Sequence, residues 1–292
     1  MASSPNQHNI IAAALWMTGA IASFTSMAVA GRSVSVAHDT FEIMLFRSIV
    51  GIAIVGLFAS WFGTLSQISA RRFGLHLIRN ISHFAGQNLW FYAITVIPLA
   101  QVFALEFTSP LWVIALATVF LGEKLNQARA IAAGVGFIGI LIVARPEASN
   151  VDPNVIIAAL AAIGFAGSAI ATKILTRTDT ITCILFWLTA MQAVFGLVMA
   201  GYDGQIALPT MQSLPWLVLI SIAGLTAHFC LTKALILAPA SVVMPIDFLR
   251  LPIVAIIGMI FYAEALDLWV LFGAALILAA NFHLIRVEAR TA

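Results

Sequence analysis

Residues 234–266 have the sequence ALILAPASVVMPIDFLRLPIVAIIGMIFYAEAL, and this stretch reveals how the chain is organised. An earlier stretch, residues 93–125, has the sequence AITVIPLAQVFALEFTSPLWVIALATVFLGEKL and aligns with it at an offset of 141. The aligned pairs include residues that are rare in apolar segments: Pro98 with Pro239, Glu106 with Asp247, and Glu123 with Glu264. Chance is a weak explanation for such matches at one offset, so the chain contains an internal repeat.

The composition places the protein in a membrane. Of its 292 residues, 62% are hydrophobic and 9% are charged, whereas a soluble domain carries about 25% charged residues. A chain this apolar could not keep its surface in water, so lipid is its expected surrounding. No nucleic-acid partner is expected.

Ten segments have the roughly 20 mostly apolar residues that a membrane-spanning helix needs. They are residues 9–30, 39–61, 74–96, 98–120, 127–144, 153–173, 180–200, 213–237, 239–262 and 267–287. The repeat divides them into five and five, in halves 1–146 and 147–292. Because five is odd, the second half must insert upside down relative to the first. The sequence therefore predicts an all-α membrane protein of ten helices in two inverted repeats, an arrangement typical of secondary transporters.

The orientation follows from the basic residues near the span ends, since cytoplasmic loops carry an excess of Lys and Arg. With the N-terminus in the cytoplasm, the inner side holds ten: Arg71, Arg72, Arg79, Lys124, Arg129, Lys173, Arg177, Lys233, Arg286 and Arg290. The outer side then holds two, Arg32 and Arg145. Both termini are therefore predicted to be cytoplasmic.

Charged residues are rare inside the predicted spans, and two pairs of them are candidate ion pairs. Arg47 and Glu106 each lie eight residues from the outer end of a span, about 12 Å deep. Equal depth predicts an ion pair between them. Asp247 and Arg250 are three apart, on one helix face, and are expected to neutralise each other. These charges either fix helix packing or line the substrate pathway, because charged groups in membranes are usually paired or functional.

Prolines interrupt two of the predicted helices. Pro110 falls within the fourth span, and Pro245 and Pro252 fall within the ninth. A proline inside a helix frees a carbonyl and kinks the axis. The three positions are candidates for a helix break or a gate, with simple kinks as the alternative.

Polar and aromatic side chains give further cavity candidates. His83, Gln87 and Trp90 are spaced at i, i+4 and i+7 and share one face of the third span, and His228 lies in the eighth. Hydrogen bonds between helices are the alternative role for these groups. Trp16, Trp112 and Trp187 also lie deep in spans, where packing competes with a role in the cavity. Two histidines without further ligands at suitable spacing do not predict a metal site.

Three short motifs carry a family resemblance. FLGEKL (120–125), its counterpart FYAEAL (261–266) and the arginine in MLFRSIVG, Arg47, resemble the EamA type of the drug/metabolite transporter superfamily. The resemblance covers the whole chain. The overall pattern of the sequence is similar to that of YddG-type amino-acid exporters. The second half departs from the pattern by lacking the glycine before Glu264 and by having Trp187 where the first half has Arg47.

The resemblance implies a secondary transporter of the bacterial inner membrane that exports amino acids or related metabolites by alternating access. No GxxxxGK[ST] motif occurs, so ATP hydrolysis and cofactors are not expected. One alternative is an exchanger of phosphorylated sugars or nucleotide sugars, which would need unpaired intramembrane cations. Another is a membrane-embedded enzyme, for which no catalytic constellation is evident. A monomer is expected.

Overall fold

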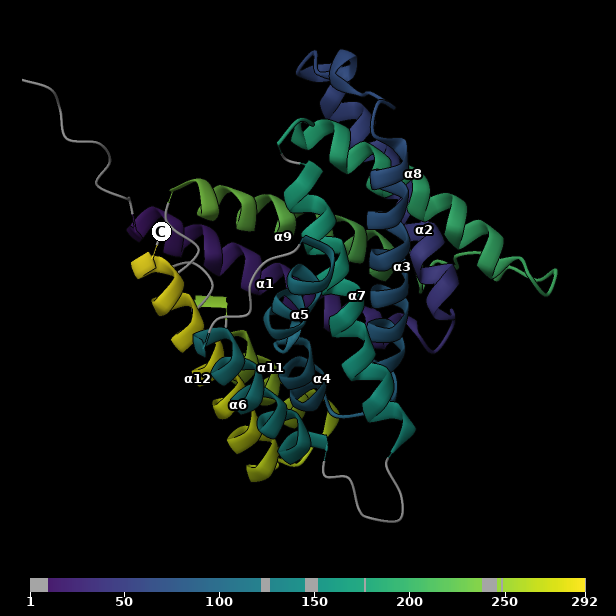
Figure 1. Ribbon diagram of the computed structural model, residues 1–292. Coiled ribbons are helices and arrows are strands. Elements are labelled where there is room, and N and C mark those ends of the chain that lie inside the picture. Colours follow the sequence, from purple (N-terminus) through teal and green to yellow (C-terminus); the bar gives the residue numbers. More distant parts are fainter. Residues whose placement is uncertain are drawn as a thin grey trace, which may run out of the picture.

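The structure, a computed structural model, describes residues 10–121, 127–144, 152–175, 177–237, 246–247 and 249–291 (Figure 1). Over these residues the chain is helical, without strands. The first half contains α1 (Ile10–Val34), α2 (Thr40–Trp61), η1 (Leu65–Gln67), α3 (Phe73–Val96), α4 (Leu99–Glu106), α5 (Ser109–Leu121) and α6 (Gln127–Ala144). The second contains α7 (Pro153–Leu175), α8 (Ile181–Ala200), α9 (Leu214–Leu237), α11 (Arg250–Tyr262) and α12 (Leu268–Thr291).

The helices agree closely with the expected spans, with one difference. Five are long and apolar enough to cross a membrane, and four shorter apolar helices accompany them. The fourth span is divided, because α4 ends at Glu106 and α5 begins at Ser109. Of the ninth span, the described part is mainly α11, so α4 with α5 and α11 complete the ten-helix count.

The helix pairs reveal the inverted repeat. The most extensive packing joins α1 to α9, α3 to α7, α6 to α12 and α2 to α8. Figure 1 shows α1 and α9 running side by side across the view and α6 lying along α12 at the lower left. Exchanging the two halves converts the α1–α9 pair into the α7–α3 pair. It leaves the α6–α12 pair and the α2–α8 pair unchanged. This pattern is what a two-fold axis between two five-helix repeats requires.

A local cap fixes the start of α2. Asp39 accepts a hydrogen bond from the Glu42 amide at 2.8 Å, and Glu42 accepts one from the Asp39 amide at 3.2 Å. This reciprocal box satisfies amides that a helix start leaves free. Glu42 also accepts a hydrogen bond from the Ala207 amide at 2.5 Å. The α1–α2 turn is thereby tied to the loop between α8 and α9.

Glycines allow α6 and α12 to touch backbone to backbone. A Cβ on Gly139 would lie 2.8 Å from the Gly273 carbonyl oxygen, and a Cβ on Gly273 would lie 2.8 Å from that of Gly139. Small residues at helix crossings are how membrane helices gain close packing. Gly134, at the other end of the same stretch GVGFIG (134–139), has no such contact, since a Cβ there would meet nothing within 4 Å.

Gly139→Val should therefore separate α6 from α12. Overpacking of this kind costs about 2 kcal/mol, which lowers the midpoint of thermal unfolding by roughly 6 °C. Thermal unfolding of the detergent-purified protein measures the effect. Gly134→Val, in the same helix, is the matched control and should leave the midpoint within about 1 °C. Equal shifts in the two variants would contradict the backbone contact.

Candidate functional site

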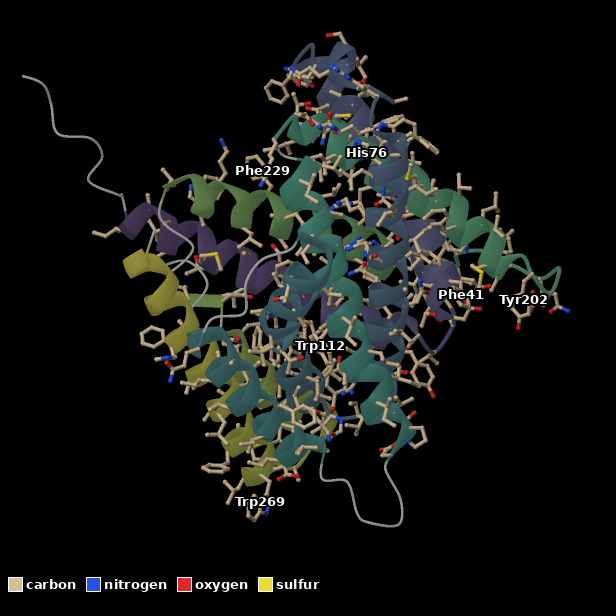
Figure 2. All side chains as sticks on the ribbon, in the orientation of Figure 1. Phe41, His76, Trp112, Tyr202, Phe229 and Trp269 are labelled. Carbon is tan, nitrogen blue, oxygen red and sulfur yellow. The ribbon has the colours of Figure 1, made fainter. Side chains whose placement is uncertain are left out.

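A polar stripe runs along α3 through the interior. His76, Asn80, His83, Gln87 and Trp90 alternate in steps of four and three, which keeps them on one helix face. All five are buried, with exposures of 5% or less. Figure 2 shows His76 toward the top of the molecule, well away from Trp269 at the lower end. The stripe therefore extends the predicted His83–Gln87–Trp90 face by about two turns, back to His76.

A small cavity lies beside this stripe, around Arg47 of α2. It holds about 10 Å³, roughly the room of one water. Its polar lining comes from three helices: Arg47, Ser48, Thr189, Gln192, Ser221 and His228. Arg47 donates to the Met44 sulfur at 3.7 Å. In the part of the chain that the structure describes, no acid lies within ion-pair distance of Arg47.

Arg79 adds a second buried cation near the cavity. Its guanidinium donates to the Thr172 hydroxyl at 2.8 Å and to the Asn80 side-chain oxygen at 3.0 Å. The expectation from the sequence that Arg79 is one of the basic residues marking the cytoplasmic side is wrong, because it lies within α3 and is 5% exposed. Like Arg47, it forms no ion pair with an acid among the described residues.

His83 and His228 meet next to these arginines. Their ring centroids are 6.1 Å apart, and the His228 ring also contacts Phe24 edge-on at 5.7 Å. His83 Nε2, Gln87 Oε1 and Gln192 Oε1 are buried without a hydrogen-bond partner. Because buried polar groups normally find partners, these atoms are available to a ligand that reaches the interior.

An acid–base triad lies at the other end of the stripe. Arg250 Nη2 donates to Glu106 Oε1 and to Asp247 Oδ2, each at 3.0 Å. Trp90 Nε1 donates to Glu106 Oε2 at 2.8 Å. The Asp247–Arg250 contact is the one that their spacing predicts. The triad joins α4 of the first half to α11 of the second and contains two carboxylates for one guanidinium.

Three aromatic rings enclose the guanidinium of Arg250. Its central carbon lies 4.7 Å from the Phe24 centroid, 5.0 Å from that of Phe103 and 5.1 Å from that of Phe107. Arg250 is 3% exposed. Cation–π contacts stabilise an arginine where water is excluded, so the triad is a desolvated electrostatic unit.

The expected Arg47–Glu106 pair is wrong. Glu106 is bound by Arg250 and Trp90 instead, and Arg47 lies in the cavity with Gln192 and Ser221. Equal depth placed the two residues in one layer of the membrane but left their helix faces undetermined. One guanidinium from the second half thus pairs with acids from both halves.

The prolines mark helix starts rather than mid-helix kinks. Pro110 is the second residue of α5 and Pro252 the third of α11, positions where the missing amide costs nothing because first-turn amides have no intrahelical partner. The break itself is at Phe107 and Thr108, where Thr108 donates its hydroxyl to the Leu105 carbonyl at 2.6 Å. Pro245 lies outside the described residues.

The other tryptophans do not gather at the cavity. Trp16 is 37% exposed and contacts Phe229 edge-on. Trp187 donates to the Ser69 carbonyl at 2.8 Å, near the start of α3. Trp112, labelled in the middle of Figure 2, has a buried indole nitrogen without a partner. Of these candidates, Trp90 alone is bonded to the triad.

A second charged cluster ties several helix ends together. Arg32, at the end of α1, pairs with Glu264 after α11, donates to the Ile97 carbonyl at 2.8 Å, and also donates to the Ile94 carbonyl. Glu264 accepts the Leu99 amide at 3.0 Å. This Arg32–Glu264 pair, called the latch below, was not predicted from the sequence, although Glu264 lies within FYAEAL and Arg32 is one of two outer basic residues.

Three further polar residues were missed: Arg79, Asn80 and Gln192. Gln192 Nε2 donates to the Asn80 carbonyl at 2.8 Å, joining α8 to α3. The sequence contained a signal for Arg79 and Asn80, because they lie four and three residues before His83 and continue its stripe. No such signal identifies Gln192, which is isolated in an apolar helix.

Comparisons with known proteins agree with this architecture. The chain matches the EamA-like transporter family over residues 11–145 and again over 153–286. It is 37% identical to a riboflavin transporter of Brucella anthropi, over 75% of this chain and 78% of that protein. It is 27% identical to an S-adenosylmethionine uptake transporter of Rickettsia bellii, over 94% of this chain and 93% of that protein.

A riboflavin transporter of Vibrio cholerae is 28% identical over 91% of this chain and 87% of its own. A protein known from a crystal structure shares the fold, with a TM-score of 0.64 and 16% identity over 96% of this chain and 98% of its own. None of these proteins is named as an amino-acid exporter. The alternative of a membrane-embedded enzyme has no support among them. The duplicated match and the two inverted five-helix repeats show that the chain is a membrane transporter of the EamA-like transporter family.

Proposed function

We propose that the protein takes up riboflavin, or a close flavin relative, by alternating access. The observation that carries the proposal is the cavity around Arg47, where a cation that has no acidic partner among the described residues meets amide and hydroxyl groups. Relatives named riboflavin transporters share 37% and 35% identity with this chain. The amino-acid export suggested by the earlier resemblance has no counterpart among them.

Riboflavin suits this lining by its hydrogen-bonding groups. One edge of its flat ring system presents two carbonyls and an N–H, its ribityl chain presents hydroxyls, and it carries no net charge at neutral pH. Arg47 is a donor for the carbonyls, while Gln192 offers an unpartnered side-chain oxygen to the N–H. Ser48, Thr189 and Ser221 complete the lining as hydroxyl groups. In this closed form the cavity is smaller than the substrate, so binding requires the repeats to separate.

S-Adenosylmethionine is the second candidate. It carries one net positive charge, which Arg47 and Arg79 would repel. The triad favours it, however, because Glu106 and Asp247 together exceed Arg250 by one negative charge. An exchanger of phosphorylated compounds is a third possibility, since Arg47 has no acidic partner among the described residues and Arg79 is a further buried cation.

We infer that the present form is closed at the end that carries the Arg32–Glu264 latch. At this end α1 packs on α3, with Gly31 so close that an added Cβ would lie 2.7 Å from the Phe91 ring. The symmetry-related pair, α7 with α9, is not among the extensive contacts of the described helices. Without Arg79, the basic bias of the sequence is still nine residues against two, and on this basis we assign the latch end to the outside and both termini to the cytoplasm.

Counterflow in proteoliposomes tests the substrate. Vesicles preloaded with unlabelled riboflavin should accumulate labelled riboflavin transiently, and external S-adenosylmethionine, flavin mononucleotide or an amino-acid mixture should not compete. Competition by one of these three would instead assign the substrate to that class of compound. Absence of riboflavin counterflow in folded protein would refute the proposal.

Arg47→Gln should reduce riboflavin counterflow strongly. Loss of a hydrogen bond from a charged donor costs about 1.5–3 kcal/mol, or roughly a 10- to 100-fold lower transport efficiency. Arg71→Gln removes an exposed arginine outside the cavity and is the matched control, with unchanged counterflow. If the two variants transport alike, Arg47 does not contact the substrate.

A further inference from the structure

The triad of Glu106, Asp247 and Arg250 has an unbalanced charge in a dry setting. Their side chains are 16%, 13% and 4% exposed, respectively. Two carboxylates share a single guanidinium nitrogen, Nη2, so one negative charge remains uncompensated. Asp247 Oδ1 and Arg250 Nε are buried without a hydrogen-bond partner. A charge in this surrounding is costly unless it is paired or neutralised by a proton.

Among the residues that the structure describes, the elements around Glu106 provide no cation other than Arg250. From α3 the group facing Glu106 is the Trp90 indole, and from α1 the Phe24 ring covers the guanidinium. On α12, Asn281 donates to the Phe107 carbonyl at 2.8 Å. The charged groups near Glu106 are Arg250 and Asp247. Among the described residues of α6, α7 and α12, none is ion-paired with it.

The connectivity of the triad makes its charge depend on conformation. Asp247 and Arg250 are three residues apart and move together. Glu106 belongs to α4 in the other repeat, and the Glu106–Arg250 contact spans the two repeats. Any motion that draws α11 away from α4 leaves Glu106 with the Trp90 N–H as its partner, surrounded by apolar side chains.

We propose that Glu106 is the proton-coupling site of this transporter, binding one proton when the repeats separate and releasing it when Arg250 returns. In the closed form the triad is Glu⁻, Asp⁻ and Arg⁺. In the separated form a proton adds to a Glu106 carboxylate oxygen, its ion pair with Arg250 breaks, and the Asp247–Arg250 pair remains. The separated triad is then neutral. Proton binding therefore favours opening, and an inward proton gradient drives uptake.

Infrared spectroscopy tests the proton site without a substrate. The wild-type protein in lipid bilayers should develop the C=O stretching band of a protonated carboxyl group on acidification, and Glu106→Gln should lose it. Glu264→Gln removes the acid of the Arg32 latch and is the control, with the Glu106 band retained. Absence of the band in wild type, or its persistence in Glu106→Gln, would overturn the proposal.

Asp247→Asn covers the case in which Glu106→Gln does not fold. Removing the neighbouring acid leaves Glu106 balanced by Arg250, so its protonation band should appear at a pH lower by roughly one unit or more. An unchanged titration would contradict charge sharing within the triad.

Transport gives a second readout, which rests on the proposed riboflavin activity. Riboflavin accumulation driven by a pH gradient, divided by counterflow in the same vesicles, should fall at least tenfold in Glu106→Gln. An unchanged ratio would overturn the coupling. Loss of riboflavin counterflow in wild type with an intact infrared band would instead refute the riboflavin assignment alone.

Discussion

Replacing Arg250 with methionine should be the most damaging single substitution in the centre of this protein. It would leave the carboxylates of Glu106 and Asp247 together in an apolar cage, and removal of one member of a buried ion pair costs about 3–5 kcal/mol. We expect little folded protein at neutral pH. The fraction that elutes as a single species in size-exclusion chromatography, together with its midpoint of thermal unfolding, measures the loss.

A rescue experiment separates the effect of the stranded charges from the effect of the lost packing contacts. Adding Glu106→Gln and Asp247→Asn to the Arg250 variant removes both stranded charges and should restore folding, but not gradient-driven transport. Arg71→Met, at an exposed position, controls for loss of an arginine as such. If the triple variant folds no better than Arg250→Met, the damage arises from the lost contacts with Phe24, Phe103 and Phe107.

Glu264→Gln should loosen the latch end of the bundle. The change keeps the shape of the side chain but removes its charge attraction for Arg32. A loss of about 1.4 kcal/mol corresponds to a tenfold larger open population. Ile97, which is 6% exposed beneath the latch, reports this opening when replaced by cysteine in a background without Cys183 and Cys230. A soluble maleimide should label it about tenfold faster.

The matched control for the latch is Asp203→Asn, an exposed acid in the loop between α8 and α9 at the same end of the bundle. It should leave the labelling rate of the Ile97→Cys variant unchanged. Equal acceleration by both substitutions would indicate a general effect of surface charge, and no acceleration by Glu264→Gln would show that the pair does not hold this end closed.

Helix positions were predictable here because the membrane imposes a length on each apolar run. The second span, expected at 39–61, is α2 at Thr40–Trp61, and the fifth, expected at 127–144, is α6 at Gln127–Ala144. The inverted repeat followed from rare residues at one offset. The division of the fourth span was partly foreseen from Pro110, although the break falls just before that proline.

Partners across helices were far less predictable. Residue spacing along one helix fixes local neighbours, and it led directly to the Asp247–Arg250 contact and to the α3 stripe. The rotation of each helix about its axis is set by packing with helices distant in sequence, so equal depth could not tell that Arg250 rather than Arg47 reaches Glu106. The Arg32–Glu264 latch, which joins residues 232 apart, was invisible for the same reason.

The two-fold arrangement of the helices also bears on how the central cavity became asymmetric. In an isologous dimer of identical chains, each substitution would appear twice, at both symmetric positions. Fusion of the two repeats into one chain removes that constraint. Arg47 of α2 faces the cavity, whereas its counterpart Trp187 in α8 bonds to Ser69 at the end of the bundle. Divergence between the halves thus allows a symmetric scaffold to surround a molecule that has no symmetry of its own.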